Sequence, residues 1–173
     1  FVIKLDENGN EQWTKLFGSN MSDAATAASL GSDQSIYLSG VTSGNLNGKT
    51  NNGGQDAFII KLDSDGNEQW TKLIGTPEEE EAYLASISSD GSIYLDGITQ
   101  GNLNGETNSG GQDAFIIKLD SDGNEQWTKL IGTSAEEVAY RPNITSNRSI
   151  YLVGITEGDL NGETNSGGQD AFI

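Results

Sequence analysis

The stretch FIIKLDSDGNEQWTKLIGT occupies residues 58–76 and recurs unchanged at residues 115–133. Over the full period, residues 58–114 and 115–171 differ at only twelve of 57 positions. The tryptophans follow the same 57-residue spacing, at Trp13, Trp70 and Trp127. A fixed period of this length indicates a repeat architecture. We therefore expect a single repeat array over residues 1–173. Its copies are 1–57, 58–114 and 115–171, with 172–173 starting a fourth.

Four strands and no helix are expected within one period. They are AFIIKL (57–62), EQWTKLI (68–74), AYLASIS (82–88) and IYLDGIT (93–99). β-Branched and aromatic residues fill these segments, and Asp-Gly turns separate them in the manner of tight hairpins. Two connections are short, whereas residues 75–81 and the Gly/Asn-rich residues 101–112 form longer loops.

This pattern predicts an all-β protein in which each 57-residue copy is a four-stranded antiparallel meander. Such a meander, repeated in tandem, is typical of a β-propeller blade. A solenoid is the competing repeat fold, but its coils are usually shorter and lack internal Asp-Gly hairpins. Segments such as AFII do not alternate polar with apolar residues, which favours sheets that are buried on both faces.

The combined pattern DAFIIKLDSDGNEQWTKLIGT and AYLASISSDGSIYLDGIT resembles the bacterial SBBP repeats, which are named for a seven-bladed β-propeller. The resemblance covers essentially the whole chain. It implies the strand order AYLASIS, IYLDGIT, AFIIKL, EQWTKLI from the axis outward, with the tryptophan half-buried at the rim. It also implies an extracellular or cell-surface protein and no enzyme activity.

Two segments depart from that pattern. AATAASL (24–30) lacks the aromatic residue of the other copies, and the third copy carries Arg141-Pro142. Since proline cannot donate to a sheet ladder, irregular pairing is expected at this strand.

The composition excludes several classes of function. Nine Lys and Arg residues stand against 26 Asp and Glu, giving a formal charge of −17, so neither nucleic acid nor an anionic membrane is an expected partner. The absence of His and Cys excludes Ser-His and Cys-His catalysis, His/Cys zinc sites and disulfides. No apolar run is long enough to span a bilayer, so no membrane insertion is expected.

The copies do not begin where the meanders begin. Residues 24–74 and 81–131 are expected to form two complete meanders, flanked by two partial ones. A propeller ring usually needs 4–8 blades. The favoured interpretation is a segment of a larger propeller. The alternative is association of chains through exposed strand edges and apolar faces.

The long loops are the predicted binding end, because binding residues usually lie on loops that a rigid scaffold holds. An acidic run in one loop and polar side chains in the other could contact a partner. The predicted partner-binding residues are Asn104, Glu106, Glu78, Glu79, Glu80 and Glu81. A solvated loop that aids solubility is the simpler explanation of the acidic run.

Calcium is the possible cofactor, because Ca²⁺ prefers 6–8 hard oxygen ligands that flexible Gly/Asn loops can supply. The candidate ligands are Asp56, Asp113, Asp170, Asn51, Asn108 and Asn165. Lys49 stands in the first copy where the others have Glu106 and Glu163, so this glutamate is not a required ligand. The alternative is structural, with Asn-Gly turns and an Asx hydrogen bond from the aspartate. The hairpin DSDGN (63–67) is interpreted as a turn only.

The favoured function is therefore a noncatalytic extracellular structural or adhesion module that binds a partner through its long-loop end. The partner would be a protein or glycan at the cell surface, or neighbouring copies of the chain, many weak contacts adding through effective concentration. One alternative is a calcium-assisted glycan-binding lectin. A second is the noncatalytic part of a larger secreted enzyme.

Overall fold

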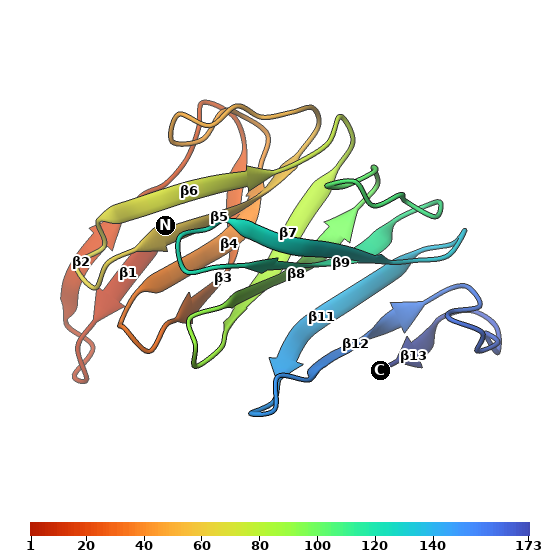
Figure 1. Cartoon of the computed structure of the whole chain (residues 1–173). Helices are drawn as coiled ribbons and strands as arrows, with labels where there is room; N and C mark the ends of the chain where they lie inside the picture. Colours follow the sequence, from red (N-terminus) through yellow and green to blue (C-terminus); the bar gives the residue numbers. More distant parts are fainter.

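The computed structural model describes all 173 residues and contains thirteen β-strands and no helix (Figure 1). Consequently, no helix long and apolar enough to cross a membrane is present. The strands form four antiparallel sheets that follow one another along the chain. The expectation of an all-β repeat of four-stranded meanders is confirmed.

Two sheets are complete, and in each the strand order along the sheet follows the sequence. The first consists of β3 (Asp23–Leu30), β4 (Ile36–Thr42), β5 (Asp56–Leu62) and β6 (Glu68–Ile74). The second consists of β7 (Glu80–Ile87), β8 (Ile93–Thr99), β9 (Asp113–Leu119) and β10 (Glu125–Ile131). The strand order within a sheet is the one that the SBBP resemblance implied. The predicted strand bounds agree with the observed ones to within two residues.

The remaining strands form two smaller sheets. An N-terminal hairpin is formed by β1 (Val2–Leu5) and β2 (Glu11–Lys15). A three-stranded sheet is formed by β11 (Glu137–Ile144), β12 (Ile150–Thr156) and β13 (Asp170–Phe172). By the 57-residue repeat, the hairpin corresponds to the β5–β6 pair and the three-stranded sheet to β7–β9.

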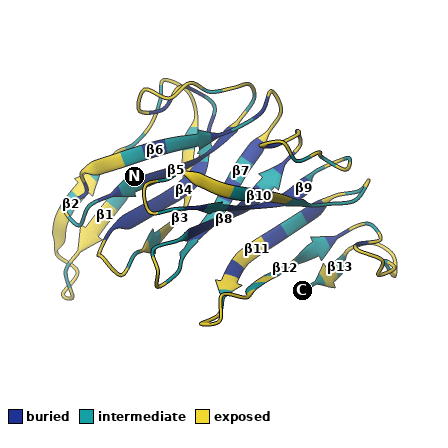
Figure 2. Cartoon of the chain, in the orientation of Figure 1, coloured by how far each residue is buried: buried dark blue, intermediate teal, exposed yellow.

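The middle strands β4, β5, β8 and β9 are buried on both faces, as the lack of alternation predicted (Figure 2). Within β5, Ile59 belongs to the core shared with the second sheet, whereas Phe58 and Ile60 belong to the core shared with the N-terminal hairpin. One strand thus serves two successive cores. At about 25 cal/mol per Å² of buried apolar surface, this double burial is the main stabilising term of the middle strands.

Each first strand of a meander carries a bulge. The pairing register shifts between Ala25 and Ala27 in β3, and between Ala82 and Leu84 in β7. In β11 the shift lies between Tyr140 and Asn143 and leaves Arg141-Pro142 out of the ladder. The irregularity expected from Pro142 is therefore present, and Arg141 adopts a positive φ of 52°.

Successive sheets are joined at the outer hairpins by one repeated contact. Gly66 and Gly123 have positive φ and lie against the indole rings of Trp13 and Trp70 of the preceding copy. The Trp70 Nε1–H also donates to the Ser121 carbonyl at 3.3 Å. The three tryptophans are half-buried on the last strand of their sheets, as expected.

Candidate functional site

The long connections meet at one end of the sheets, since strands alternate in direction and the short hairpins occupy the other end (Figure 1). In the second copy, Asn108 organises the loop. Its amide donates to the carbonyls of Thr99 (3.3 Å) and Gly111 (3.5 Å), and its oxygen accepts the Gly110 N–H at 2.7 Å. Asn51 and Asn165 make the equivalent bonds in the other copies.

The predicted aspartates begin the strand that follows each loop. Asp56 and Asp113 are fully buried, and each accepts one loop N–H, from Asn52 at 3.1 Å and from Ser109 at 2.9 Å. Asp170 is half-buried and accepts the Ser166 N–H at 2.6 Å. The Oδ1 atoms of Asp56 and Asp113 have no hydrogen-bond partner. Burial raises the pKa of both carboxyl groups, and the nearby Glu80 and Glu137 raise it further.

These contacts bear on the calcium prediction. The asparagine side-chain oxygens accept loop N–H groups, so a structural role explains why asparagine recurs at this position in every copy. No group of three or more His, Cys, Asp or Glu residues lies in an arrangement that could hold a metal ion. Calcium binding by the loops stays a prediction.

Asn108→Ala is expected to lower the free energy of unfolding by about 1–2 kcal/mol, because the loop loses three hydrogen bonds, two of which are partly shielded from water. Urea unfolding of the 173-residue chain measures this loss. Thr107→Ala is the control, since that exposed side chain makes no hydrogen bond in the loop. Equal stability of the two variants would contradict the structural role of Asn108.

The four glutamates of the acidic run Glu78–Glu81 differ in how far they are buried. Glu78 and Glu79 are exposed, Glu81 is half-buried, and burial raises the pKa of Glu81. Glu80 is buried in the interior, so the structure moves it out of the predicted partner-binding surface. The physical reason is that β7 begins at Glu80, which directs its side chain inward.

The Glu80 carboxylate joins the connection before β7 to the end of β8. It accepts the Thr76 N–H at 2.5 Å, the Thr76 hydroxyl at 2.7 Å and the Thr99 hydroxyl at 2.6 Å. Glu137 makes the same three bonds in the third copy, and Asp23 makes them with Ser19 and Thr42 in the first. The acidic residue is therefore a repeated structural element of the loop end.

The other two predicted partner residues lie against the outer strand. Asn104 is exposed, and its amide donates to the Glu125 carboxylate at 2.9 Å and to the Thr128 hydroxyl at 3.0 Å. Glu106 forms an ion pair with Lys129 at 2.8 Å. These contacts hold the long loop over β10 and leave Asn104 accessible at the surface.

A polar groove, here called the long-loop groove, lies between two connections of the second copy. It has a volume of about 470 Å³ and no hydrophobic residue in its lining. Its lining residues are Thr76, Pro77, Glu78, Gln100, Gly101, Asn102, Asn108, Ser109 and Gly110. The side chains of Glu78 and Gln100 make no hydrogen bond within the chain, so their polar atoms are free to bind a ligand.

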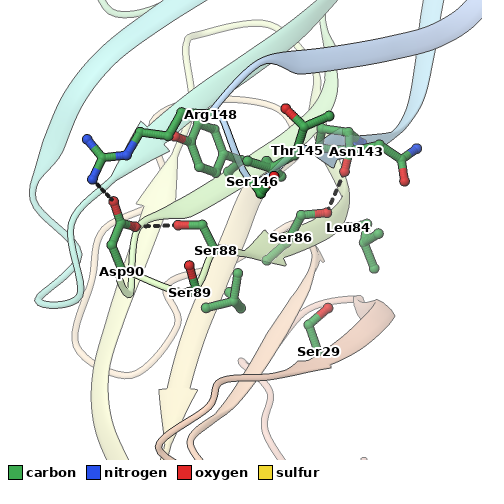
Figure 3. Close-up of a pocket in the computed structure, with 15 residues that line it drawn as sticks. Ser29, Leu84, Ser86, Ser88, Ser89, Asp90, Asn143, Thr145, Ser146 and Arg148 are labelled. Atoms are coloured by element: carbon green, nitrogen blue, oxygen red, sulfur yellow. Dashed lines mark hydrogen bonds and ion pairs between the residues drawn. The ribbon is translucent and has the colours of Figure 1, made fainter.

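A second groove, here called the hairpin-end groove, opens between β7 and β11 near the short hairpins (Figure 3). Its volume is about 560 Å³, and hydroxyl groups dominate its polar lining. The Ser86 hydroxyl donates to the Pro142 carbonyl at 2.8 Å across the two strands. Arg148 and Asp90 form an ion pair at 3.5 Å that links the two hairpins at the rim.

The chemistry of the hairpin-end groove suits binding better than catalysis. The Ser88 hydroxyl donates to Asp90, and this bond with those from Ser92 holds the pKa of the Asp90 carboxyl far below its usual range. A carboxylate with so low a pKa is a weak base, which leaves Ser88 without an activating group. The Asp90–Arg148 pair is neutral overall, so the groove favours an uncharged polar ligand.

The hairpin-end groove was not predicted from the sequence. Ser29, Ser86 and Asn143 occupy the same position of three successive copies, on β3, β7 and β11, and all three line it. A polar residue recurring at a 57-residue spacing on the first strand was the available signal. In the same way, the acidic residue that recurs every 57 residues as Asp23, Glu80 and Glu137 indicated the buried carboxylate–threonine hydrogen bonds.

Comparison with known proteins finds similarity to part of one longer protein. No protein-family model matches the chain. In an alignment 160 residues long that covers 83% of the chain, the sequence is 31% identical to the regulatory protein FlaEY of Caulobacter vibrioides. The matching region spans 17% of FlaEY, so the chain resembles one part of a much longer protein.

Proposed function

We propose that the four sheets are successive blades of a β-propeller, and that the chain is a noncatalytic extracellular structural or adhesion module. The partner, a protein or glycan at the cell surface or another copy of the chain, binds at the long-loop end. The observation that carries this proposal is the loop framework. Three copies of the same asparagine and carboxylate hydrogen bonds hold equivalent loops at one end of the sheets.

The propeller arrangement is supported by the contacts between sheets. β7 packs against β3, β4 and β5 of the preceding sheet, and β11 packs against β7, β8 and β9 in the same manner. The first strands of successive sheets are thus neighbours, which is the arrangement of inner strands around a propeller axis. Burial of both faces of the middle strands of each complete sheet agrees with blades that stand between two neighbours.

A glycan ligand is the second candidate, and the long-loop groove favours it. The groove presents a carboxylate, a primary amide and a hydroxyl on a hydrogen-bonded loop frame, and it has no hydrophobic lining. Such groups pair with the hydroxyls of a neutral sugar. Calcium assistance would require ligands beyond the single buried aspartate of each loop.

The test measures binding of the labelled 173-residue chain to a glycan array and to beads coated with the same chain. We expect a signal from at least one probe that falls at least tenfold in the double variant Gln100→Arg/Ser109→Arg. These two exposed residues line the long-loop groove. Absence of binding to both probes would contradict the proposal.

The control is Gln69→Arg/Gln126→Arg, which adds the same charge at exposed positions of the outer strands β6 and β10. We expect its binding to equal that of the unmodified chain. An equal loss in both double variants would show that charge alone governs binding, and the long-loop end would then have no special role.

A further inference from the structure

A buried carboxyl group lies at the seam between the second complete sheet and the sheet that follows. Asp96 of β8 is fully buried, and its Oδ2 accepts the N–H of Arg141 of β11 at 3.1 Å. Its Oδ1 has no hydrogen-bond partner. An unpaired oxygen of a buried carboxylate is costly, so the protonation state of this group requires an explanation.

The preceding seam shows how this position is used in another copy. Ser39 stands where the second copy has Asp96, and its hydroxyl donates to the Tyr83 carbonyl of the next sheet at 3.3 Å. The Thr26 hydroxyl lies within hydrogen-bond distance of the same carbonyl at 3.0 Å and of the Ala82 carbonyl at 2.7 Å, so its single proton is shared between them. The bulge of β7 therefore receives O–H groups from the sheet before it.

Both donors are replaced at the next seam. Tyr83 takes the place of Thr26, and its ring stacks on Tyr140 with centroids 6.1 Å apart. Asp96 takes the place of Ser39, and the carbonyl equivalent to that of Tyr83 is the carbonyl of Tyr140. A carboxylic acid, unlike a carboxylate, carries an O–H that can replace the serine hydroxyl.

We propose that Asp96 is protonated in the folded chain at mildly acidic pH and then donates its Oδ1–H to the bulge of β11 while its Oδ2 accepts the Arg141 N–H. Protonated Asp96 thereby closes the seam with a donor and an acceptor, as Ser39 and Thr26 close the preceding one with hydroxyls. Loss of the proton removes the donor, leaves a buried negative charge and loosens the contact between the two sheets.

The charges around Asp96 agree with this assignment. Desolvation raises the pKa of Asp96 to about 6, although the backbone N–H groups of Arg141, Asp96 and Leu84 and the guanidinium of Arg141 act in the opposite direction. The other titratable groups on the packed strands are Glu80, Glu81 and Tyr83 of β7, Asp113 and Lys118 of β9, and Glu137 and Tyr140 of β11. Lys118 of β9 is directed over the Tyr94 ring at 5.5 Å and so does not serve as a direct counter-ion.

The seam is consequently sensitive to pH. The folded chain holds the proton at a higher pH than the unfolded chain does, so the stabilisation is fully present in acid. It falls as the pH rises toward the folded pKa of about 6 and is lost above it. The hairpin-end groove lies between β7 and β11, the first strands of the two sheets that this seam joins. Ionisation of Asp96 therefore acts on the groove as well as on the seam.

The direct test follows the Asp96 carboxyl carbon by NMR in the full 173-residue chain while the pH is changed. We expect a midpoint near 6. A midpoint at or below about 4, the ordinary value of an aspartate, would overturn the proposal. This measurement uses the unmodified chain and does not depend on the folding of any variant.

A second test compares urea unfolding of the unmodified chain with Asp96→Asn, whose amide supplies a donor and an acceptor without a titratable proton. Relative to this variant, the folding equilibrium constant of the unmodified chain should fall by about 30-fold between pH 4.5 and pH 7.5. Asp96→Ser, which carries the residue of the first seam, should behave like Asp96→Asn. Asp65→Asn removes the same charge at an exposed hairpin residue and should leave the pH dependence unchanged. Parallel pH profiles of the unmodified chain and Asp96→Asn would overturn the proposal.

Discussion

Glu80→Ala is expected to destabilise the chain by about 3–5 kcal/mol in urea unfolding at pH 7, since the buried Thr76 N–H and two threonine hydroxyls lose their common acceptor. The loss should concentrate at the connection between the two complete sheets, where hydrogen exchange of the Thr76 amide would report it. Removal of Glu80 should also lower the pKa of Asp56, because the charge of Glu80 helps to raise it.

Glu80→Gln is the matched control, because its amide oxygen still accepts hydrogen bonds from part of the network. We expect this variant to lose less than half as much stability as Glu80→Ala. Glu79→Ala removes an exposed carboxylate one residue away and should stay within about 0.5 kcal/mol of the unmodified chain. If Glu80→Ala lost no more stability than Glu79→Ala, Glu80 would not have the buried structural role assigned to it.

Gly97→Ala is expected to cost about 3 kcal/mol or more, because β7 and Phe115 leave no room for a side chain on β8 at this position. A Cβ there would overlap the Glu81 carbonyl oxygen and lie 2.5 Å from the Phe115 ring. Gly40 and Gly154 face the same obstacle in the other copies. Thermal unfolding of the 173-residue chain measures the effect.

Two further variants separate the possible causes of that loss. Phe115→Leu combined with Gly97→Ala should not restore stability, because the backbone carbonyl of Glu81 still blocks the Cβ. Gly105→Ala has open space but a φ of 88°, so it should cost only about 1 kcal/mol through backbone conformation. Recovery of stability in the double variant would show that the aromatic ring was the true obstacle.

Most of the fold could be predicted from the sequence, because the features that define it are local and repeated. The β8 segment 93–99 agrees with its expected bounds, and the absence of alternation in AFII correctly indicated burial on both faces. The bulge at Tyr83 could not be predicted in this way. It depends on how the first strand of one sheet meets the preceding sheet, and no single residue type is common to all three copies at this position, which holds Thr26, Tyr83 and Tyr140.

The candidate site was only partly accessible from the sequence. A run of four glutamates appears uniform, yet Glu80 is interior because Thr76 and Thr99, separated by 23 residues, converge on it. Asn108 was correctly placed in the loop. Whether its side chain stabilises a turn or binds a metal depends on which backbone carbonyls lie near it, and the sequence does not give their positions. The hairpin-end groove combines side chains from three sheet segments and has no continuous motif.

The stacking of Gly66 on Trp13 and of Gly123 on Trp70 has a consequence for how such a chain can evolve. Every copy carries both partners of this contact, the tryptophan ring and the hairpin glycine. Unequal recombination between nearly identical gene segments can then insert or delete whole copies while each new junction reuses a surface already selected. Length can change in steps of 57 residues without a new interface, whereas the loss of an outer hairpin alone would leave an indole without its glycine.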